Sequence, residues 1–245
     1  MRLIEESKMT QHVPPRAIPP VRSRLSVRAR LLLGAALLVS PLALASAARA
    51  TPVLSLTLSE SGFTTRSYFS GTGMLNFSNA YGTFETISGF ATGVPMIGST
   101  NQPQIDLSSL NIAGATGTLT MTLTETGLAI GSPATVSGNI GGTNAGPISE
   151  QQSIYASANG GASYTEIASS GVLSGASFAS DISGAFTFSG NDALEEVITI
   201  AASGGAANSS FDAHESVPEP GALALLGTGL ALLGTLRPRR KRALA

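Results

Sequence analysis

The sequence predicts an all-β fold, an antiparallel β-sandwich or a jelly-roll-like domain, with a short apolar segment at each end of the chain. Three observations predict it. Apolar and polar residues alternate through the middle of the chain, and more than half of residues 51–217 are Ser, Thr, Gly or Ala. Basic residues gather beside the two apolar segments, while residues 51–220 contain thirteen acidic residues and one basic residue, Arg66.

The alternation is clearest in residues 118–124, which read Thr-Leu-Thr-Met-Thr-Leu-Thr. Side chains of a strand point alternately to its two faces, so Leu119, Met121 and Leu123 share one face and four threonines share the other. This period of two is typical of an antiparallel strand that is buried on one side. Leu54, Leu56 and Leu58 alternate in the same way, and Ile182, Phe186 and Phe188 are expected to share a third apolar face.

Short strands separated by Gly-rich or Asn-rich turns, such as residues 71–73, favour a sandwich or a jelly roll. The predicted strands are 53–59, 63–70, 73–79, 83–91, 105–112, 117–126, 134–140, 152–158, 163–169, 172–180, 183–189 and 194–202. Residues 131–146 are predicted to form the longest loop. Residues 54–63 and 119–128 have similar sequences, and we interpret them as equivalent strands of one domain.

The chain is divided by composition into four parts. Residues 1–50 are the predicted signal peptide, and residues 51–202 the exported β-rich domain. Residues 203–217 are rich in Gly, Ala, Asn and Ser, which predicts a flexible tether. Residues 218–245 form a C-terminal tail.

Residues 1–50 have the three regions of a secretory signal peptide. Residues 1–30 are basic, and residues 31–45 form an apolar run that is shorter than the ~20 residues of a spanning helix. Ala48 and Ala50 supply small side chains before Thr51, so cleavage is expected after Ala50, with the Sec machinery as the export partner. A permanent N-terminal anchor is the alternative, and Met9 is a second candidate start.

The C-terminal tail combines two prolines, an apolar run and a basic cluster. Pro218, Glu219 and Pro220 precede the apolar residues 221–236, and prolines favour an extended backbone before a helix. The apolar run predicts one short transmembrane helix of about 24 Å. Basic residues stay on the cytoplasmic side of a membrane, so the cluster is expected to orient the helix and leave residues 51–220 outside. The cluster consists of Arg237, Arg239, Arg240, Lys241 and Arg242.

This tail closely resembles the PEP-CTERM sorting signal of Gram-negative bacteria, with motif, apolar segment and basic residues in the same order. The resemblance implies recognition by an exosortase, a membrane-embedded protease or transpeptidase, and Pro218, Glu219 and Pro220 match its motif. The same tail is also labelled "ice-binding protein C-terminal", a label that does not establish ice binding. Residues 194–213 also resemble the last strand and tether of other PEP-CTERM proteins. A permanent C-terminal anchor that is never processed is the alternative.

The residues that usually carry catalysis are few, and no catalytic residue is assigned. The chain has no cysteine, which excludes disulfides and thiolate chemistry, and His214 is the one histidine outside the leader. Asp212 and Glu215 lie near it, but all three fall in the predicted tether, where a catalytic triad would lack a rigid base. We therefore expect no enzyme activity, no zinc site and no nucleic-acid partner.

Calcium is the one cofactor that the acidic composition leaves open. Asp192, Glu195 and Glu196 follow Asn191 closely, and carboxylates are ligands that Ca²⁺ prefers. No calcium-loop motif is present, and a solvated acidic surface is the simpler interpretation, so no metal ligand is assigned.

These features predict an exported, non-enzymatic surface or extracellular-matrix protein that is sorted by an exosortase. The expected path crosses the inner membrane, with a transient membrane anchor before display at the cell surface. Association with exopolysaccharide or biofilm is implied by the resemblance alone. The alternative is a carbohydrate-binding or ice-binding β module anchored at the surface. The absence of tryptophan disfavours the first ligand, and the single row of threonines at 118–124 disfavours the second.

Overall fold

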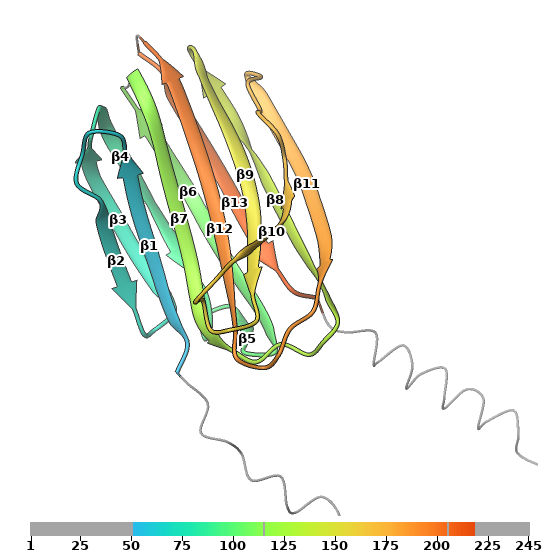
Figure 1. Cartoon of the computed structure of the whole chain (residues 1–245). Helices are drawn as coiled ribbons and strands as arrows, with labels where there is room; N and C mark the ends of the chain where they lie inside the picture. Colours follow the sequence, from blue (N-terminus) through green and yellow to red (C-terminus); the bar gives the residue numbers. More distant parts are fainter. Residues whose placement is uncertain (1–50, 115, 205, 219–245) are drawn as a thin grey trace, which may run out of the picture. The chain divides into compact units, whose positions relative to one another are not determined.

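The structure is a computed structural model that describes residues 51–114, 116–204 and 206–218. These residues form two antiparallel sheets that face each other, which confirms the predicted all-β sandwich (Figure 1). Among them there is no helix that could cross a membrane. The predicted signal peptide (1–50) and the predicted transmembrane segment (221–236) lie outside the described residues.

Six strands form the first sheet, sheet A. They are β1 (Val53–Glu60), β2 (Arg66–Ser70), β7 (Thr116–Leu128), β9 (Ile148–Ser157), β10 (Thr165–Ser169) and β12 (Asp192–Ser203), in the order β10-β9-β12-β7-β1-β2. Sheet B contains β3 (Met74–Tyr81), β4 (Phe84–Thr92), β6 (Gln102–Ala113), β8 (Ala134–Ala145), β11 (Ser177–Phe186) and β13 (Asn208–Ser216), in the order β11-β8-β13-β6-β4-β3. The short strand β5 (Gly98–Ser99) pairs with β6.

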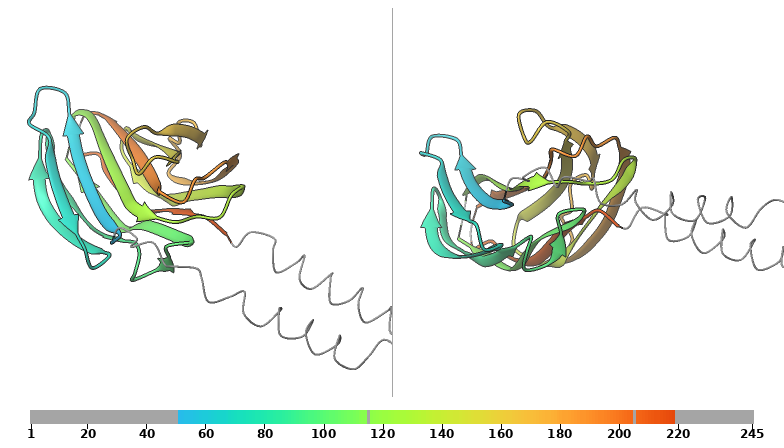
Figure 2. Two further views of the ribbon diagram at one scale, coloured as in Figure 1. Left: turned by 60° about the horizontal axis from the view of Figure 1, so that its bottom comes forward. Right: turned by 90° about the horizontal axis from the view of Figure 1, so that it is seen from below.

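Most consecutive strands from β6 onward lie in opposite sheets, which is a jelly-roll-like connection pattern. β6 contacts β7, β8 contacts β9, and β10 contacts β11 across the interior. Seen from below, the two curved layers enclose the core (Figure 2). The chain therefore builds both sheets together along its length.

The alternating sequences form the core as predicted. Leu54, Leu56 and Leu58 are at most 1% exposed, and the apolar residues of β7 from Leu119 to Leu123 are fully buried. β1 and β7 pair antiparallel with Leu56 opposite Leu123, so the two similar stretches of sequence lie side by side in one sheet. Ile182 and Phe186 are partly buried against the core, and Phe188 is buried, as their shared spacing predicted.

The predicted tether at 203–217 is wrong, because Asn208–Ser216 form strand β13 in the interior of sheet B. β13 pairs with β6 on one side and β8 on the other, and Phe211, Ala213 and Val217 are buried. The small residues that suggested a linker are tolerated because neighbouring strands satisfy their backbone groups. The sandwich therefore extends to residue 216 and does not end at 202.

The predicted long loop at 131–146 is also wrong, since residues 134–145 form β8, which confirms and extends the strand predicted at 134–140. Its Gly141-Gly142 pair suggested a turn, but Gly142 lies where a Cβ would clash with Phe211 of the neighbouring strand. Glycine here allows a close approach between strands. One strand, β11, replaces the two predicted at 172–180 and 183–189, and β5 and β13 were not predicted.

We predict that Phe211→Ala lowers the free energy of unfolding by about 3–5 kcal/mol, since the side chain is 2% exposed and its ring lies 6.3 Å from that of Phe178. The matched control is Ser210→Ala, the exposed neighbour in the same strand, with an expected change within about 0.5 kcal/mol. Denaturant titration measures both. If both substitutions had equally small effects on the free energy of unfolding, residues 208–216 would behave as a flexible tether after all.

Candidate functional site

The predicted sorting motif begins where the sandwich ends. The Val217 N–H donates to the Pro103 carbonyl at 3.0 Å, and the next residue, Pro218, is exposed and is the last described one. Glu219 and Pro220 lie outside the described residues, as do the basic cluster from Arg237 to Arg242 and the predicted cleavage residues Ala48 and Ala50.

His214 lies on the outer face of sheet B, in β13, and not in a tether. Its Nδ1 is 3.9 Å from Asp106 Oδ1, and the Ser108 hydroxyl donates to the other oxygen of Asp106. The aspartate thus lies between serine and histidine, whereas a catalytic triad needs the histidine between the other two. Glu215 points to the opposite face of the strand, and Asp212 accepts a hydrogen bond from the Ser109 N–H at 2.5 Å.

The acidic residues considered for calcium do not converge. Asp192 accepts hydrogen bonds from the backbone N–H groups of Ser189, Gly190 and Ile130, at 2.9–3.1 Å. Glu195 faces outward and accepts from the Thr124 hydroxyl at 3.3 Å, whereas Glu196 faces the interior. Asp192 therefore organises a turn, and the other two carboxylates lie on opposite faces of β12.

Half of the twelve acidic residues between 51 and 218 are buried, a feature that the sequence analysis missed. They are Glu60, Glu125, Glu150, Asp192, Glu196 and Glu215. Besides Asp192, three of them accept side-chain or backbone hydrogen bonds: Glu60 from the Thr83 N–H at 2.8 Å, Glu150 from Asn144 Nδ2 at 2.7 Å, and Glu196 from Gln152 Nε2 at 2.5 Å. The interior of this sandwich is therefore acidic as well as apolar.

Burial shifts the ionisation of interior acids on β7, β12 and β13. It raises the pKa of Glu125 to about 8, opposed by the Val94 backbone, and it raises the pKa of Glu196 to about 8, opposed by a hydrogen bond from Gln152. The pKa of Glu215 is raised well above its ordinary value by burial and by the nearby Glu196 carboxylate. The physical cause is that a charged carboxylate loses its hydration in the core.

The alternation itself contained the signal for these residues. Glu125 has the same spacing parity as Leu119, Met121 and Leu123, so a strand that buries those three also buries it. Glu196 is likewise in phase with Ile198. An acidic residue in phase with an apolar face is thus predictable as buried.

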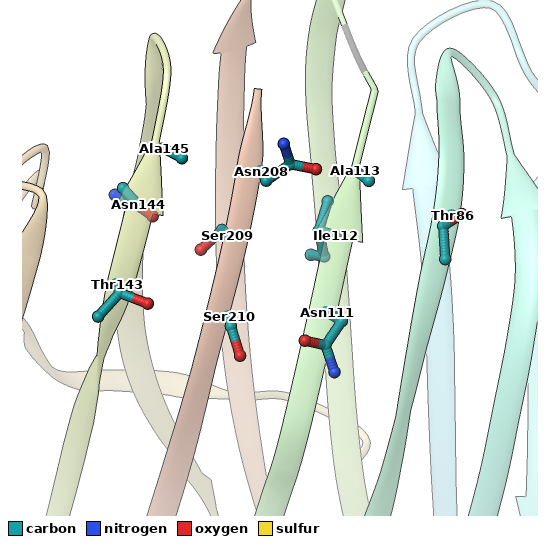
Figure 3. Close-up of a pocket in the computed structure, with 10 residues that line it drawn as sticks. All are labelled: Thr86, Asn111, Ile112, Ala113, Thr143, Asn144, Ala145, Asn208, Ser209 and Ser210. Atoms are coloured by element: carbon teal, nitrogen blue, oxygen red, sulfur yellow. The ribbon is translucent and has the colours of Figure 1, made fainter. Parts of the chain in front are cut away.

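The outer face of sheet B carries a row of small polar side chains. Thr143, Ser210, Asn111 and Ser88 stand opposite one another on four neighbouring strands. Thr143, Ser210 and Asn111 of this row line a shallow depression of about 290 Å³. Thr86 of β4 and Asn208, between β13 and β6, also line it (Figure 3). Hydroxyl and amide groups both donate and accept hydrogen bonds, so the depression suits a neutral polar ligand.

A second depression of about 270 Å³ is lined by Gly141, Thr143, Ser210 and Asp212, among others. It shares Asn111, Thr143 and Ser210 with the first depression. We call the two together the polar groove of sheet B. On the outer face of sheet A, the threonine row of β7 has residues of two adjacent strands beside it, but these are not all threonines. Thr122, for example, lies between Thr57 of β1 and Val197 of β12.

We predict that the protein loses stability as the pH rises from 4.5 to 8. Over this range the folded state keeps the Glu125 proton and the unfolded state releases it. The contribution of this proton to the free energy of unfolding is therefore complete below pH 4.5 and is lost as the pH rises through 8. Each such group contributes a slope of about 1.4 kcal/mol per pH unit. Glu125→Gln should flatten the curve of unfolding midpoint against pH in metal-free buffer. Exposed Glu166→Gln should leave it unchanged, and parallel curves for Glu125→Gln and wild type would contradict the prediction.

Comparison with known proteins supports the C-terminal assignment. The PEP-CTERM protein-sorting motif matches residues 216–241, which confirms the resemblance seen in the sequence. The comparison with curated proteins finds no match. The matched segment begins at the last residue of β13, so residues 216–241 carry a PEP-CTERM sorting motif joined directly to the sandwich.

Proposed function

We propose that this chain is an exported, non-enzymatic surface protein whose β-sandwich is delivered to the extracellular matrix by exosortase sorting and associates there with exopolysaccharide. The observation that carries the proposal is the sorting motif at residues 216–241. Its core residues follow the last hydrogen bond of the folded domain, at Val217. In this proposal the folded domain is the exported part of the chain, and the tail is the signal that directs its sorting.

The charge of the folded domain supports export to an aqueous, crowded matrix. Arg66 is its one Lys or Arg side chain, and it lies exposed on the edge strand β2. A surplus of acidic groups keeps a protein soluble and limits self-association. The polar row of sheet B and the threonines of β7 on sheet A offer hydrogen bonds at the surface.

The polar groove of sheet B is the surface that we propose for polysaccharide contact. Its hydroxyl and amide groups match the hydroxyl groups of a neutral sugar chain. Exposed Asn111, Thr143 and Ser210 stand in one row across β6, β8 and β13, so an extended chain lying across these strands can meet each of them. The groove is shallow, which is compatible with weak, repeated contacts along a polymer.

We predict that replacing Pro218, Glu219 and Pro220 with Ala traps the full-length precursor in the membrane. Without the prolines the backbone at the outer interface is free to become helical, and a protease needs it extended. A fractionation blot of an epitope-tagged chain, in hosts with and without exosortase, measures the released form. Glu166→Ala, an exposed change in β10, is the control and should be released normally. Release of the triple-Ala chain at the wild-type level would favour a permanent or differently processed anchor.

We predict that Asn111→Ala combined with Ser210→Ala weakens binding to exopolysaccharide purified from the producing cells by roughly tenfold. Each lost neutral hydrogen bond contributes about 0.5–1.5 kcal/mol, and two of them amount to about one decade in affinity. Co-sedimentation with the polymer measures the effect. The control is Thr57→Ala with Thr120→Ala on sheet A, which should bind as wild type. Equal losses in both variants, or none in either, would remove the polar groove from the proposal.

A further inference from the structure

Three fully buried side chains face the interior between the sheets, and we call them the oxygen cluster: Gln152 of β9, Glu196 of β12 and Glu215 of β13. Gln152 Nε2 donates to Glu196 Oε1 at 2.5 Å. The same nitrogen lies 3.1 Å from the carbonyl oxygens of Asn139 and His214, which belong to sheet B. Gln152 thereby bridges the two sheets.

The hydrogen bonding of the oxygen cluster is incomplete. Neither oxygen of Glu215 has a partner, and Glu196 Oε2 and Gln152 Oε1 also have none. The amide nitrogen has two hydrogens but three oxygen atoms within 3.1 Å. The cluster therefore contains more acceptors than donors, an arrangement that is costly in a core unless protons or another positive charge neutralise the carboxylates.

No basic side chain of the described residues can supply that charge. Arg66 is exposed on β2, and the His214 ring faces outward beside Asp106. Gly138 stands opposite Glu215, and a Cβ there would lie 2.8 Å from Ile154 Cγ2 and 3.3 Å from Gln152 Nε2, so the backbone of β8 comes close to the amide. The cluster thus has unpaired oxygen atoms and a neighbour without a side chain.

We propose that Glu196, Glu215 and Gln152 form a calcium site that joins the two sheets. Two carboxylates and the amide oxygen, with the Asn139 and His214 carbonyls beside them, make an oxygen-only ligand set, which Ca²⁺ prefers with six to eight oxygen ligands. Rotation of the Gln152 amide by half a turn presents Oε1 in place of Nε2, because the two ends have the same shape. Mg²⁺ holds its waters more tightly, and zinc prefers nitrogen and sulfur ligands, so both fit a dry oxygen site less well.

The site has two carboxylates and no more. Among residues 51–218, as far as the structure describes them, no three His, Cys, Asp or Glu side chains are grouped as metal ligands. The amide and the backbone carbonyls have to complete the shell. Bound calcium would tie β9 and β12 of sheet A to β13 of sheet B, the strand that leads into the sorting tail. This inference is independent of the polysaccharide contact.

The test uses the full-length chain, purified in mild detergent and stripped with EGTA. Isothermal titration with CaCl₂ at pH 7.5 should give about one Ca²⁺ per chain. Saturating CaCl₂ should raise the thermal midpoint by at least about 5 °C over EGTA, because a ligand that binds the folded state alone stabilises it. MgCl₂ at the same concentration should give a smaller shift.

Glu215→Gln keeps the side-chain shape, removes one charged ligand, and should lower calcium affinity at least tenfold. Glu125→Gln, a buried acid of β7 outside the oxygen cluster, is the matched control and should keep the full calcium response. The proposal of a calcium site is overturned if the wild-type chain binds no calcium and has equal thermal midpoints in EGTA and CaCl₂. Protons would then neutralise Glu196 and Glu215. If Glu215→Gln does not fold, the calcium content of the unstripped wild-type chain decides, with about one ion expected and none overturning the proposal.

Discussion

Burial of the apolar side chains on the inward faces of the sheets is the interaction on which the rest of the structure depends. β7 and β12 pair in register along most of their length, with Leu119 opposite Ile200 and Met121 opposite Ile198, and all four side chains are fully buried. Burying each such side chain stabilises the fold by roughly 1.5–3 kcal/mol. Because the buried apolar side chains gather in this layer, it supplies most of the driving force for folding.

The same layer contains the molecule's main electrostatic cost. Glu125 and Glu196 face inward because the alternation that buries the leucines and isoleucines buries them as well. In the core, a carboxylate is stable as a neutral acid, as a well-hydrogen-bonded anion, or beside a cation. Glu60 and Asp192 have the hydrogen bonds, whereas Glu215 has none. The stability of the sandwich is thereby linked to the pH of its surroundings, which for an exported protein is the pH outside the cell.

The position of β13 couples folding to sorting. β13 lies between β6 and β8, so sheet B is incomplete until the chain has been built as far as residue 216. One residue, Val217, separates this strand from Pro218. The sandwich and the sorting motif are therefore not separated by a flexible spacer, and a protease that acts at the motif works directly beside the folded domain.

The sequence by itself determined the fold class, most strands, the buried faces of β1 and β7, and the sorting motif, because these depend on local periodicity and short motifs. It also contained the parity that buries Glu125, although composition alone suggested an acidic surface. Only the tertiary structure decided that 208–216 is a strand, because a segment of small polar residues is a tether or a strand according to what pairs with it. For the same reason, only the structure brought Gln152, Glu196 and Glu215 together: they come from three strands in two sheets, and no local pattern encodes which strands face each other.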